Sequence, residues 1–221
     1  MDIIAMSERG DVESREVFVA RNVDWWRKQQ RSRVEAERWP VFEQFLCDCK
    51  FSRGAAVGWS LGEIGGGPYG GILRGCGVVA RRYYFIDYIQ RELCALGFID
   101  WPPENVYVTA PAEDLPLRDG ELDCLLSYNT LDHGWDIEAA LRECVRVARR
   151  SYVCFDCRSE DEEDAALRRG IDKDHWQLLR FAQVEEVLSR LGTPYILRDA
   201  SKNHNRRKAL VLMGEACSDR T

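Results

Sequence analysis

Glu63-Ile64-Gly65-Gly66-Gly67-Pro68-Tyr69-Gly70-Gly71 is the most glycine-rich stretch of the chain. An apolar run at residues 57–64 leads into it, and a helical pattern at residues 72–78 follows. The sequence therefore predicts a strand, a glycine loop and a helix in that order. Glycines reach positive φ and let the backbone approach a ligand closely, and the start of a helix offers free N–H groups. Such a loop is typical of a site for a nucleotide-like ligand.

Strand and helix patterns alternate along the rest of the chain. Further apolar runs occur at residues 83–86, 106–108, 122–126 and 152–155, and further helical patterns at residues 89–96 and 137–148. A helix at residues 175–191 precedes two short strands at residues 195–197 and 209–213. This alternation implies right-handed crossovers and a parallel sheet with helices on both faces. We therefore predict an α/β, Rossmann-like fold, in which ligands bind at the carboxyl ends of the strands.

A helical extension is predicted before this alternating region. Residues 22–47 carry a helical pattern, which Pro40 should kink or divide into two helices. Its aromatic residues, among them Trp25, Trp26 and Trp39, fit either packing against the core or a lid over a ligand cleft. The predicted organisation is an N-terminal helical extension at 1–50, a ligand-binding domain at 51–215 and a tail at 216–221.

The composition fits a globular domain. The chain has 221 residues and a net charge of −6, and this acidic balance argues against a general nucleic-acid binder. No run approaches the roughly 20 apolar residues of a membrane span, and the N-terminus lacks the apolar core of a signal peptide. We therefore expect a cytoplasmic protein outside the membrane. The nine cysteines lie mostly in apolar contexts, which predicts reduced, buried thiols and no metal site.

Asp87 is the first polar residue after the second predicted strand. In dinucleotide-binding folds an acid about 20 residues beyond the glycines accepts hydrogen bonds from ribose hydroxyls. A carboxylate suits that role because its two oxygens can accept from two neighbouring hydroxyls. The alternative is an aspartate that merely caps the following helix. Together with the glycine loop, Asp87 favours the ribose contact.

Three motifs follow one another in the order Glu63-Ile64-Gly65-Gly66-Gly67-Pro68, then Ala112-Glu113-Asp114-Leu115-Pro116-Leu117 through Leu122-Asp123, then Ala140-Leu141-Arg142-Glu143 through Arg146-Val147. With this order and spacing the chain resembles a class I S-adenosylmethionine-dependent methyltransferase of the small-molecule type. The resemblance covers residues 56–157, and 172–213 more loosely. It implies a seven-stranded, mostly parallel sheet whose last strand is antiparallel, and S-adenosyl-L-methionine as the cofactor.

The resemblance also implies roles for individual residues. Glu63 and the glycines Gly65, Gly66 and Gly67 would face the methionine end of the cofactor, and Asp87 would hold its ribose. Ala112 and Glu113 would border the adenine, and Asn129 would line the cleft beside the methionine moiety. The chain departs from its relatives at Pro111, where many carry an aspartate, and at Arg149-Arg150-Ser151, which replaces a Pro-Gly-Gly turn.

His133 is the candidate general base. It follows the fourth predicted strand directly after Asp132, which could orient it or bind substrate. Histidine is the natural base near neutral pH when an acceptor must lose a proton. The alternative is a capping aspartate followed by a surface histidine. The other histidines, His175 and His204, fit a helix start and an exposed turn.

The resulting hypothesis is a methyltransferase that transfers a methyl group in line to oxygen or nitrogen of a small molecule. Sugar or natural-product tailoring is one candidate role. Two alternatives stay open: an NAD(P)-dependent oxidoreductase, which would share the glycine loop and the strand-end acid, and a catalytically silent methyltransferase-like binding subunit. The expected partner is a small-molecule methyl acceptor, and a homo-oligomer is compatible with the sequence.

Overall fold

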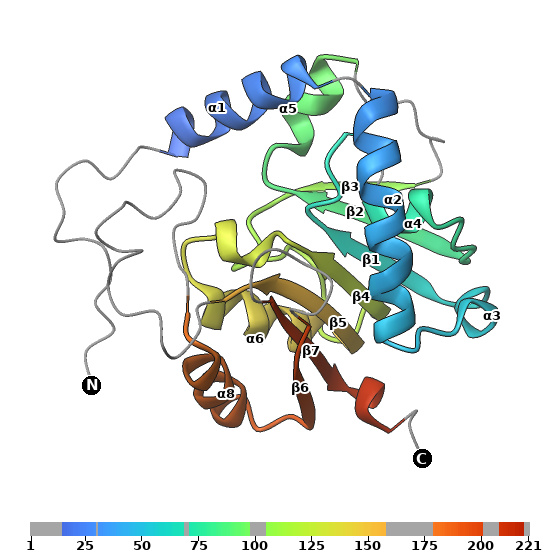
Figure 1. Cartoon of the computed structure of the whole chain (residues 1–221), viewed down its shortest axis with the longest axis vertical. Coiled ribbons are helices and arrows are strands. Elements are labelled where there is room, and N and C mark those ends of the chain that lie inside the picture. Colours follow the sequence, from blue (N-terminus) through green and yellow to red (C-terminus); the bar gives the residue numbers. More distant parts are fainter. Residues whose placement is uncertain are drawn as a thin grey trace, which may run out of the picture.

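The computed structural model of the chain describes residues 15–29, 31–68, 71–97, 105–157, 179–200 and 208–218 (Figure 1). The strands are β1 (Ser60–Ile64), β2 (Arg82–Asp87), β3 (Val106–Thr109), β4 (Leu122–Tyr128), β5 (Ala148–Asp156), β6 (Tyr195–Asp199) and β7 (Lys208–Gly214). The helices are α1 (Arg15–Lys28), α2 (Arg31–Asp48), α3 (Arg53–Ala56), α4 (Gly71–Gly75), α5 (Gln90–Ala95), α6 (Ile137–Val147) and α8 (Phe181–Arg190), with short 3-10 turns η2 (Leu131–His133) and η4 (Glu215–Cys217).

The strands form one seven-stranded sheet in the order β3-β2-β1-β4-β5-β7-β6. The pairs β3–β2, β2–β1, β1–β4 and β4–β5 are parallel, whereas β7 runs antiparallel to both β5 and β6. The predicted Rossmann-like α/β fold with an antiparallel last strand is therefore confirmed. The chain order reverses between β1 and β4, and ligands of such sheets bind at a reversal of this kind.

Helices cover both faces of the sheet, because successive side chains of a strand point to opposite sides. In β4, Leu125 packs toward α6 and α8, while its neighbours Cys124 and Leu126 pack toward α2 and α4. All three side chains are fully buried. In Figure 1, α2 lies across one face of the sheet, and α6 and α8 lie on the other side. A central strand buried on both faces reads as a continuous apolar run, as this one does.

The aromatic residues of α2 are mainly packing residues. Phe42, Phe45 and Leu46 are buried in the cluster that α2 shares with α4 and the sheet. A third, smaller cluster joins α1 to α5 through residues that include Trp26 and Leu93. The N-terminal helices thus pack closely on the sheet domain, and α1 lies beside α5 at the top of Figure 1.

Two local predictions were wrong in their boundaries. The N-terminal helical pattern divides into α1 and α2 near Gln29 rather than at Pro40, which lies inside α2. Pro40 is exposed, where water can satisfy the carbonyl that a proline leaves without a donor. The first strand begins only at Ser60, because Ser52 caps the short helix α3 by accepting from the Ala55 N–H at 3.4 Å. His175 and His204 lie outside the described residues.

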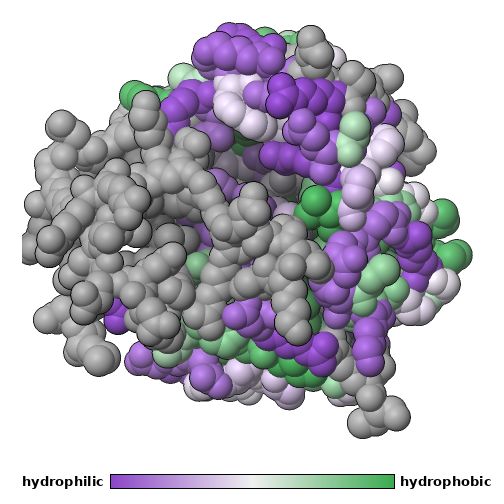
Figure 2. All heavy atoms as spheres, viewed as in Figure 1, coloured by the Kyte–Doolittle hydropathy of each residue, from purple (hydrophilic) through white to green (hydrophobic). Residues whose placement is uncertain are grey.

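Figure 2 shows one face of the described surface, coloured by hydropathy. On the face shown in Figure 2, hydrophilic residues predominate and hydrophobic ones form small, separate patches. Among the described residues, none of the helices is both long and apolar enough to cross a membrane.

Candidate active site

The glycine loop is held between the ends of β2 and β4. The Gly65 N–H donates to the Ile86 carbonyl at 2.8 Å, and Gly65 has a φ of 76°. A Cβ at this position would lie 2.1 Å from Oγ1 of Thr130, just after β4. Gly67 has a φ of 64°, and a Cβ there would lie 2.5 Å from the ring of Trp26 in α1. Only glycine fits the conformation and the space at these two positions.

Glu63 supports this loop from within the protein. Its side chain is buried and accepts from the Ile72 N–H at 2.6 Å and the Leu73 N–H at 3.0 Å, at the start of α4. Burial raises the pKa of Glu63 to about 7, and the two N–H donors oppose that rise. The position two residues after Leu61 places Glu63 on the α4 face of β1. The carboxylate thus anchors the turn from β1 into α4, and its direct contact with a cofactor stays a prediction.

Asp87 joins the end of β2 to the glycine loop. It is partly buried, and its carboxylate accepts from the Ile89 N–H at 3.1 Å and from the N–H groups of Gly67 and Tyr88. Burial raises the pKa of Asp87 to about 6, against the effect of these donors. The predicted ribose acid thus lies directly beside the glycine loop, at the carboxyl end of β2.

Glu113 shapes the segment that leads into α6. Its Oε1 accepts from the Trp135 N–H at 2.5 Å and the Asp136 N–H at 3.1 Å. The Trp135 ring then meets the Tyr88 ring edge to face, with centroids 5.1 Å apart. Sequence reasoning missed this aromatic pair, although an aromatic residue directly after the strand-end acid Asp87 was a visible signal. Glu113 therefore links the β3–β4 connection to the wall beside Asp87.

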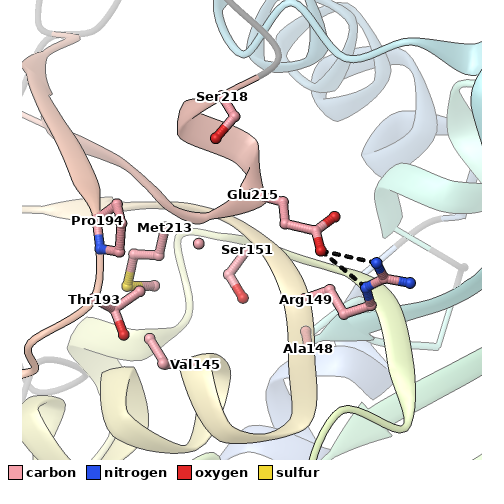
Figure 3. A pocket seen from close by; sticks show the side chains of 10 residues that line it. Val145, Ala148, Arg149, Ser151, Thr193, Pro194, Met213, Glu215 and Ser218 are labelled. Carbon is pink, nitrogen blue, oxygen red and sulfur yellow. Dashed lines mark hydrogen bonds and ion pairs between the residues drawn. The ribbon is translucent and has the colours of Figure 1, made fainter.

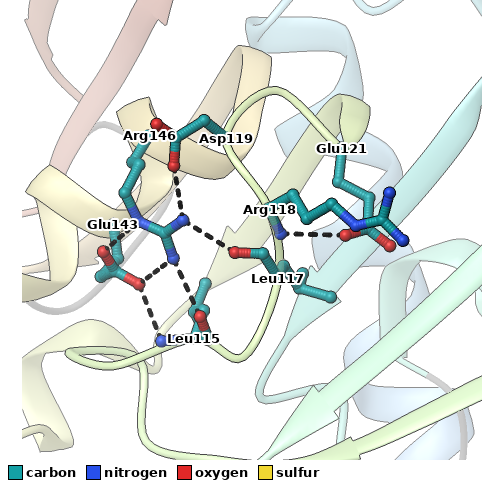
Figure 4. A network of polar contacts seen from close by, with 7 residues as sticks. All are labelled: Leu115, Leu117, Arg118, Asp119, Glu121, Glu143 and Arg146. Atoms are coloured by element: carbon teal, nitrogen blue, oxygen red, sulfur yellow. Dashed lines mark hydrogen bonds and ion pairs between the residues drawn. The ribbon is translucent and has the colours of Figure 1, made fainter.

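The third sequence motif fastens the β3–β4 connection to α6 (Figure 4). Arg146 donates to the carbonyls of Leu115 at 2.8 Å and Leu117 at 2.7 Å, and to Asp119 at 2.8 Å. Glu143 accepts from the Leu115 N–H at 2.7 Å and also holds the Arg146 guanidinium. These contacts fix the segment that carries the two predicted adenine neighbours, of which Ala112 packs against the core.

Asn129 follows β4 and faces the start of β7. It adopts a φ of 54°, a left-handed conformation that asparagine tolerates better than most residues. Its N–H donates to the Cys154 carbonyl at 2.7 Å, and its Oδ1 accepts from Lys208 Nζ at 2.5 Å. The Asn129 Nδ2 lies 3.4 Å from Nε2 of His133, a partly buried side chain in η2. The structure thus brings Asn129 and His133 together, as the sequence predicted for one end of the sheet.

Asp132 has a different place from the one expected. Its side chain is 0% exposed, and its Oδ2 accepts from the Asp156 N–H at 3.1 Å. The carboxylate therefore binds the end of β5, so contact with a substrate does not fit it. Sequence reasoning also missed the buried ion pair between Asp156 and Lys208, which face each other in the β5–β7 register. A lysine at the start of an otherwise apolar strand was the available signal.

A pocket at the other end of the sheet does not belong to this site. It is lined by residues that include Val145, Ser151 and Met213, and the paired Arg149 and Glu215 lie at its rim (Figure 3). These residues lie near the amino end of β5, whereas the glycine loop, Asp87 and Asn129 follow the carboxyl ends of β1, β2 and β4. Ligands of doubly wound sheets bind at the carboxyl ends.

The residues at the carboxyl edge fit a nucleoside cofactor. The loop can approach a ligand through backbone atoms, since side chains are excluded at Gly65 and Gly67. The Asp87 carboxylate is only partly buried and bears a raised pKa, so hydroxyl donors that stabilise its ionised form would be favourable. The arrangement therefore suits a ribose, with Tyr88 and Trp135 offering flat apolar rings nearby.

Comparison with known families agrees with this site. Residues 63–155 match the family model described as a methyltransferase domain. A probable S-adenosylmethionine-dependent methyltransferase of Mycobacterium tuberculosis is 31% identical over 86 residues, which are 39% of this chain and 30% of that protein. The chain thus aligns with less than a third of the length of this curated relative.

Solved structures share the fold at low identity. The structure of a Haloferax volcanii complex between the Trm112 methyltransferase activator and its methyltransferase partner matches with a TM-score of 0.64 and 13% identity, over 87% of this chain and 96% of that one. A phosphoethanolamine N-methyltransferase of Haemonchus contortus, solved with phosphomonomethylethanolamine and S-adenosylhomocysteine, matches with a TM-score of 0.65 and 10% identity, over 80% and 52% of the two chains. These likenesses concern the fold.

The comparisons agree with the predicted resemblance over the segment that they match. The matched segment begins at Glu63, spans the glycine loop, Asp87 and Asn129, and ends within β5. It therefore contains every loop that the structure brings together at the carboxyl edge from β1 to β4. S-adenosylmethionine is the cofactor that this family assignment supports.

Proposed function

We propose that this protein is an S-adenosylmethionine-dependent methyltransferase that transfers a methyl group to oxygen or nitrogen of a small molecule, since residues 63–155 match a methyltransferase domain. One observation carries the proposal. The Gly65–Gly67 turn lies between Asp87 and Thr130, so the glycine loop, the β2 acid and the β4 loop form one continuous surface. Bound S-adenosylmethionine supplies an electrophilic methyl group there, and the protein supplies position and electrostatics.

In this proposal Asp87 accepts from the ribose hydroxyls, and the backbone at Gly65 and Gly67 lies along the cofactor. Asn129 lines the methionine side, and Ala112 borders the adenine. Glu63 and Glu113 act one step away, because their carboxylates bind backbone N–H groups of the surrounding loops. They hold the walls of the site rather than the ligand.

His133 is the proposed general base. It lies in η2 beside Asn129, partly buried, at the carboxyl edge of β4. A hydroxyl acceptor would lose its proton as its oxygen bonds the methyl carbon, whereas an ammonium group must lose a proton before its nitrogen can attack; in both cases His133 would take that proton. The carbon–sulfur bond of the cofactor would break as the new bond forms, with S-adenosylhomocysteine as the leaving group. Asp132 is not part of this step, since its carboxylate binds the end of β5.

The N-terminal helices are the proposed substrate cover. Trp26 already lies against the glycine loop at Gly67, and Trp25 meets it edge to face with centroids 4.6 Å apart. Trp25 is 43% exposed, and the Arg38 guanidinium of α2 lies 5.8 Å from its ring centroid. An exposed aromatic residue beside the cofactor loop suits an acceptor with an apolar or ring-bearing part. Sugar or natural-product tailoring fits this setting.

Calorimetric titration with S-adenosylhomocysteine tests cofactor binding. We expect saturable binding to the wild type, and a loss of about tenfold to a hundredfold in affinity for Asp87→Ala, since hydrogen bonds to a charged group contribute about 1.5–3 kcal/mol. Asp114→Ala removes an exposed acid of the same edge and should leave the affinity unchanged. Binding of NADP⁺ in place of S-adenosylhomocysteine would instead support the oxidoreductase.

Methyl transfer from labelled S-adenosylmethionine to a panel of hydroxyl- and amine-bearing small molecules tests catalysis. His133→Ala should lower turnover about a hundredfold or more while leaving the affinity for S-adenosylhomocysteine within about twofold. Near-normal turnover of this variant would remove His133 as the base. Cofactor binding without transfer to any acceptor would favour the silent binding subunit.

A further inference from the structure

A buried polar chain runs from β7 to His133, and the proposed reaction does not account for it. Lys208 Nζ bonds Asp156 Oδ1 and Asn129 Oδ1, and the other end of the Asn129 amide lies 3.4 Å from Nε2 of His133. Lys208 and Asp156 are buried, with side-chain exposures of 7% and 6%. Charged groups are rarely buried without a specific arrangement to satisfy them. Asn129 connects the buried Lys208–Asp156 pair to His133, the candidate base.

Lys208 determines how the Asn129 amide is oriented. An ammonium group only donates hydrogen bonds, so the Asn129 atom that it contacts at 2.5 Å must be the carbonyl oxygen. The amide NH₂ is then left to face His133. Asparagine orientations are commonly ambiguous, but a buried cation on one side removes the ambiguity. The Tyr128 ring, 5.3 Å from Nζ, lies against the same cation.

The amide orientation in turn selects the His133 tautomer. A neutral imidazole has one N–H and one lone pair, and which nitrogen carries the proton follows from the hydrogen bonds around it. An Nε2 that accepts from the Asn129 amide would carry the lone pair and leave the ring proton on Nδ1. We propose that Lys208 is a positioning residue, which acts through Asn129 to keep the lone pair of His133 on Nε2.

This inference rests on the proposed function, in which His133 is the general base. The nitrogen that can accept a proton is the one beside Asn129, the residue proposed to line the methionine side of the cleft. An acceptor approaching the methyl group would then meet the lone pair of Nε2, and its proton would pass to that nitrogen as the new bond forms. The 3.4 Å contact with the amide is long and therefore easily exchanged for an acceptor hydroxyl or amine.

Nitrogen-15 NMR of the histidine rings tests the proposal directly, with the His133 signals assigned by their loss in His133→Gln. We expect the neutral imidazole of wild-type His133 to carry its ring proton on Nδ1. Asn129→Asp keeps an oxygen for Lys208 but turns a second oxygen toward Nε2, so the proton should move to Nε2. Aspartate also tolerates the left-handed backbone of this position. A wild-type ring protonated on Nε2, or an unchanged ring in Asn129→Asp, would overturn the proposal.

Variants of Lys208 test its own part. Lys208→Arg retains a buried donor-only cation and should keep the Nδ1–H tautomer, whereas Lys208→Met should lose the preference for it. Equal tautomers in Lys208→Met and wild type would sink the role of Lys208, and if Lys208→Met does not fold, Asn129→Asp and Lys208→Arg decide. Asp114→Asn, an exposed acid of the same edge, is the matched control and should leave the ring unchanged.

S-adenosylhomocysteine titration of the same samples separates the two proposals. If the wild type does not bind it, the proposed function fails while the ring tautomer still tests the positioning by Lys208. If the wild type binds it and carries the proton on Nε2, the positioning fails and the methyltransferase proposal stands. Where an acceptor has been found, Lys208→Met should lower kcat at least tenfold with little change in the cofactor Kd, because the effect passes through the base.

Discussion

Two pairs of acids lie at the same edge of the sheet: Glu63 with Asp87, and Asp132 with Asp156. The two pairs differ in the groups that contact their carboxylates. Among the described residues, Glu63 and Asp87 are bonded by backbone N–H groups, and burial raises both pKa values. Asp132 also accepts from a backbone N–H, that of Asp156, but Asp156 itself is paired with a buried lysine, Lys208. The β4–β5–β7 side therefore supplies its own cation. On the β1–β2 side, hydroxyl donors of a ligand would stabilise the ionised form of Asp87, and this is the side on which we propose that the cofactor binds.

The largest effect is expected when Asp156, the acid paired with Lys208, is removed. Asp156→Ala leaves the Lys208 ammonium buried without its carboxylate, which should cost about 3–5 kcal/mol in the free energy of unfolding. Urea denaturation followed by circular dichroism measures this loss. Glu186→Ala is the control, because it breaks an exposed pair with Arg190 on α8 and should cost less than about 1 kcal/mol. Equal losses in the two variants would mean that the Lys208 cluster is not a buried unit.

The pH dependence of cofactor affinity tests the role of Asp87 on the β1–β2 side. The pKa of Asp87 is about 6 without ligand, and hydroxyl donors bind its ionised form. The affinity for S-adenosylhomocysteine should therefore be constant above pH 7 and fall as the pH drops through 6, by up to about tenfold per pH unit. Calorimetric titration from pH 5 to 8 measures it. Asp87→Asn should remove the dependence, and an unaltered profile in that variant would place the titrating group elsewhere.

On the β1–β2 side, the free energy of unfolding should depend on pH in the opposite direction from the cofactor affinity. Because their pKa values are raised on folding, Glu63 and Asp87 bind protons more tightly in the native state than in the unfolded chain. Their contribution to the free energy of unfolding is therefore fully present at low pH and is lost as the pH rises, from 3.8 to about 6 for Asp87 and from 4.5 to about 7 for Glu63. As the pH rises, cofactor affinity should therefore increase while the free energy of unfolding decreases. The two measurements distinguish the role of these acids in binding from their role in folding.

Much of the β1–β2 side was predictable from sequence, because it depends on local order. A strand, three glycines and a strand-end acid place Gly65 and Asp87 together in any parallel sheet of this kind. The backbone contacts of Glu63 were not predictable, for a physical reason. Strand side chains alternate between faces, and the position two residues after the core residue Leu61 directs Glu63 toward α4 rather than the cleft. The sequence shows the alternation of side chains along the strand. It does not show which face of the sheet α4 covers.

The β4–β5–β7 side could not be predicted, because it depends on pairing between distant segments. Asp156 and Lys208 are 52 residues apart and meet only through the antiparallel register of β5 and β7. Nothing local in either strand fixes that register. The division of the N-terminal helix near Gln29 is similar, since α2 follows its packing against α4 rather than the helix-breaking tendency of Pro40.

The smallest expected effect concerns Glu113, a third acid of this edge. Both N–H donors, from Trp135 and Asp136, converge on its single oxygen Oε1, so one neutral acceptor oxygen should suffice. Glu113→Gln should therefore change the free energy of unfolding by less than about 1 kcal/mol, whereas Glu113→Ala leaves both donors without this partner and should cost about 1–3 kcal/mol. Urea denaturation of both variants measures the difference. A glutamine variant as unstable as the alanine variant would show that the charge of Glu113 contributes to stability.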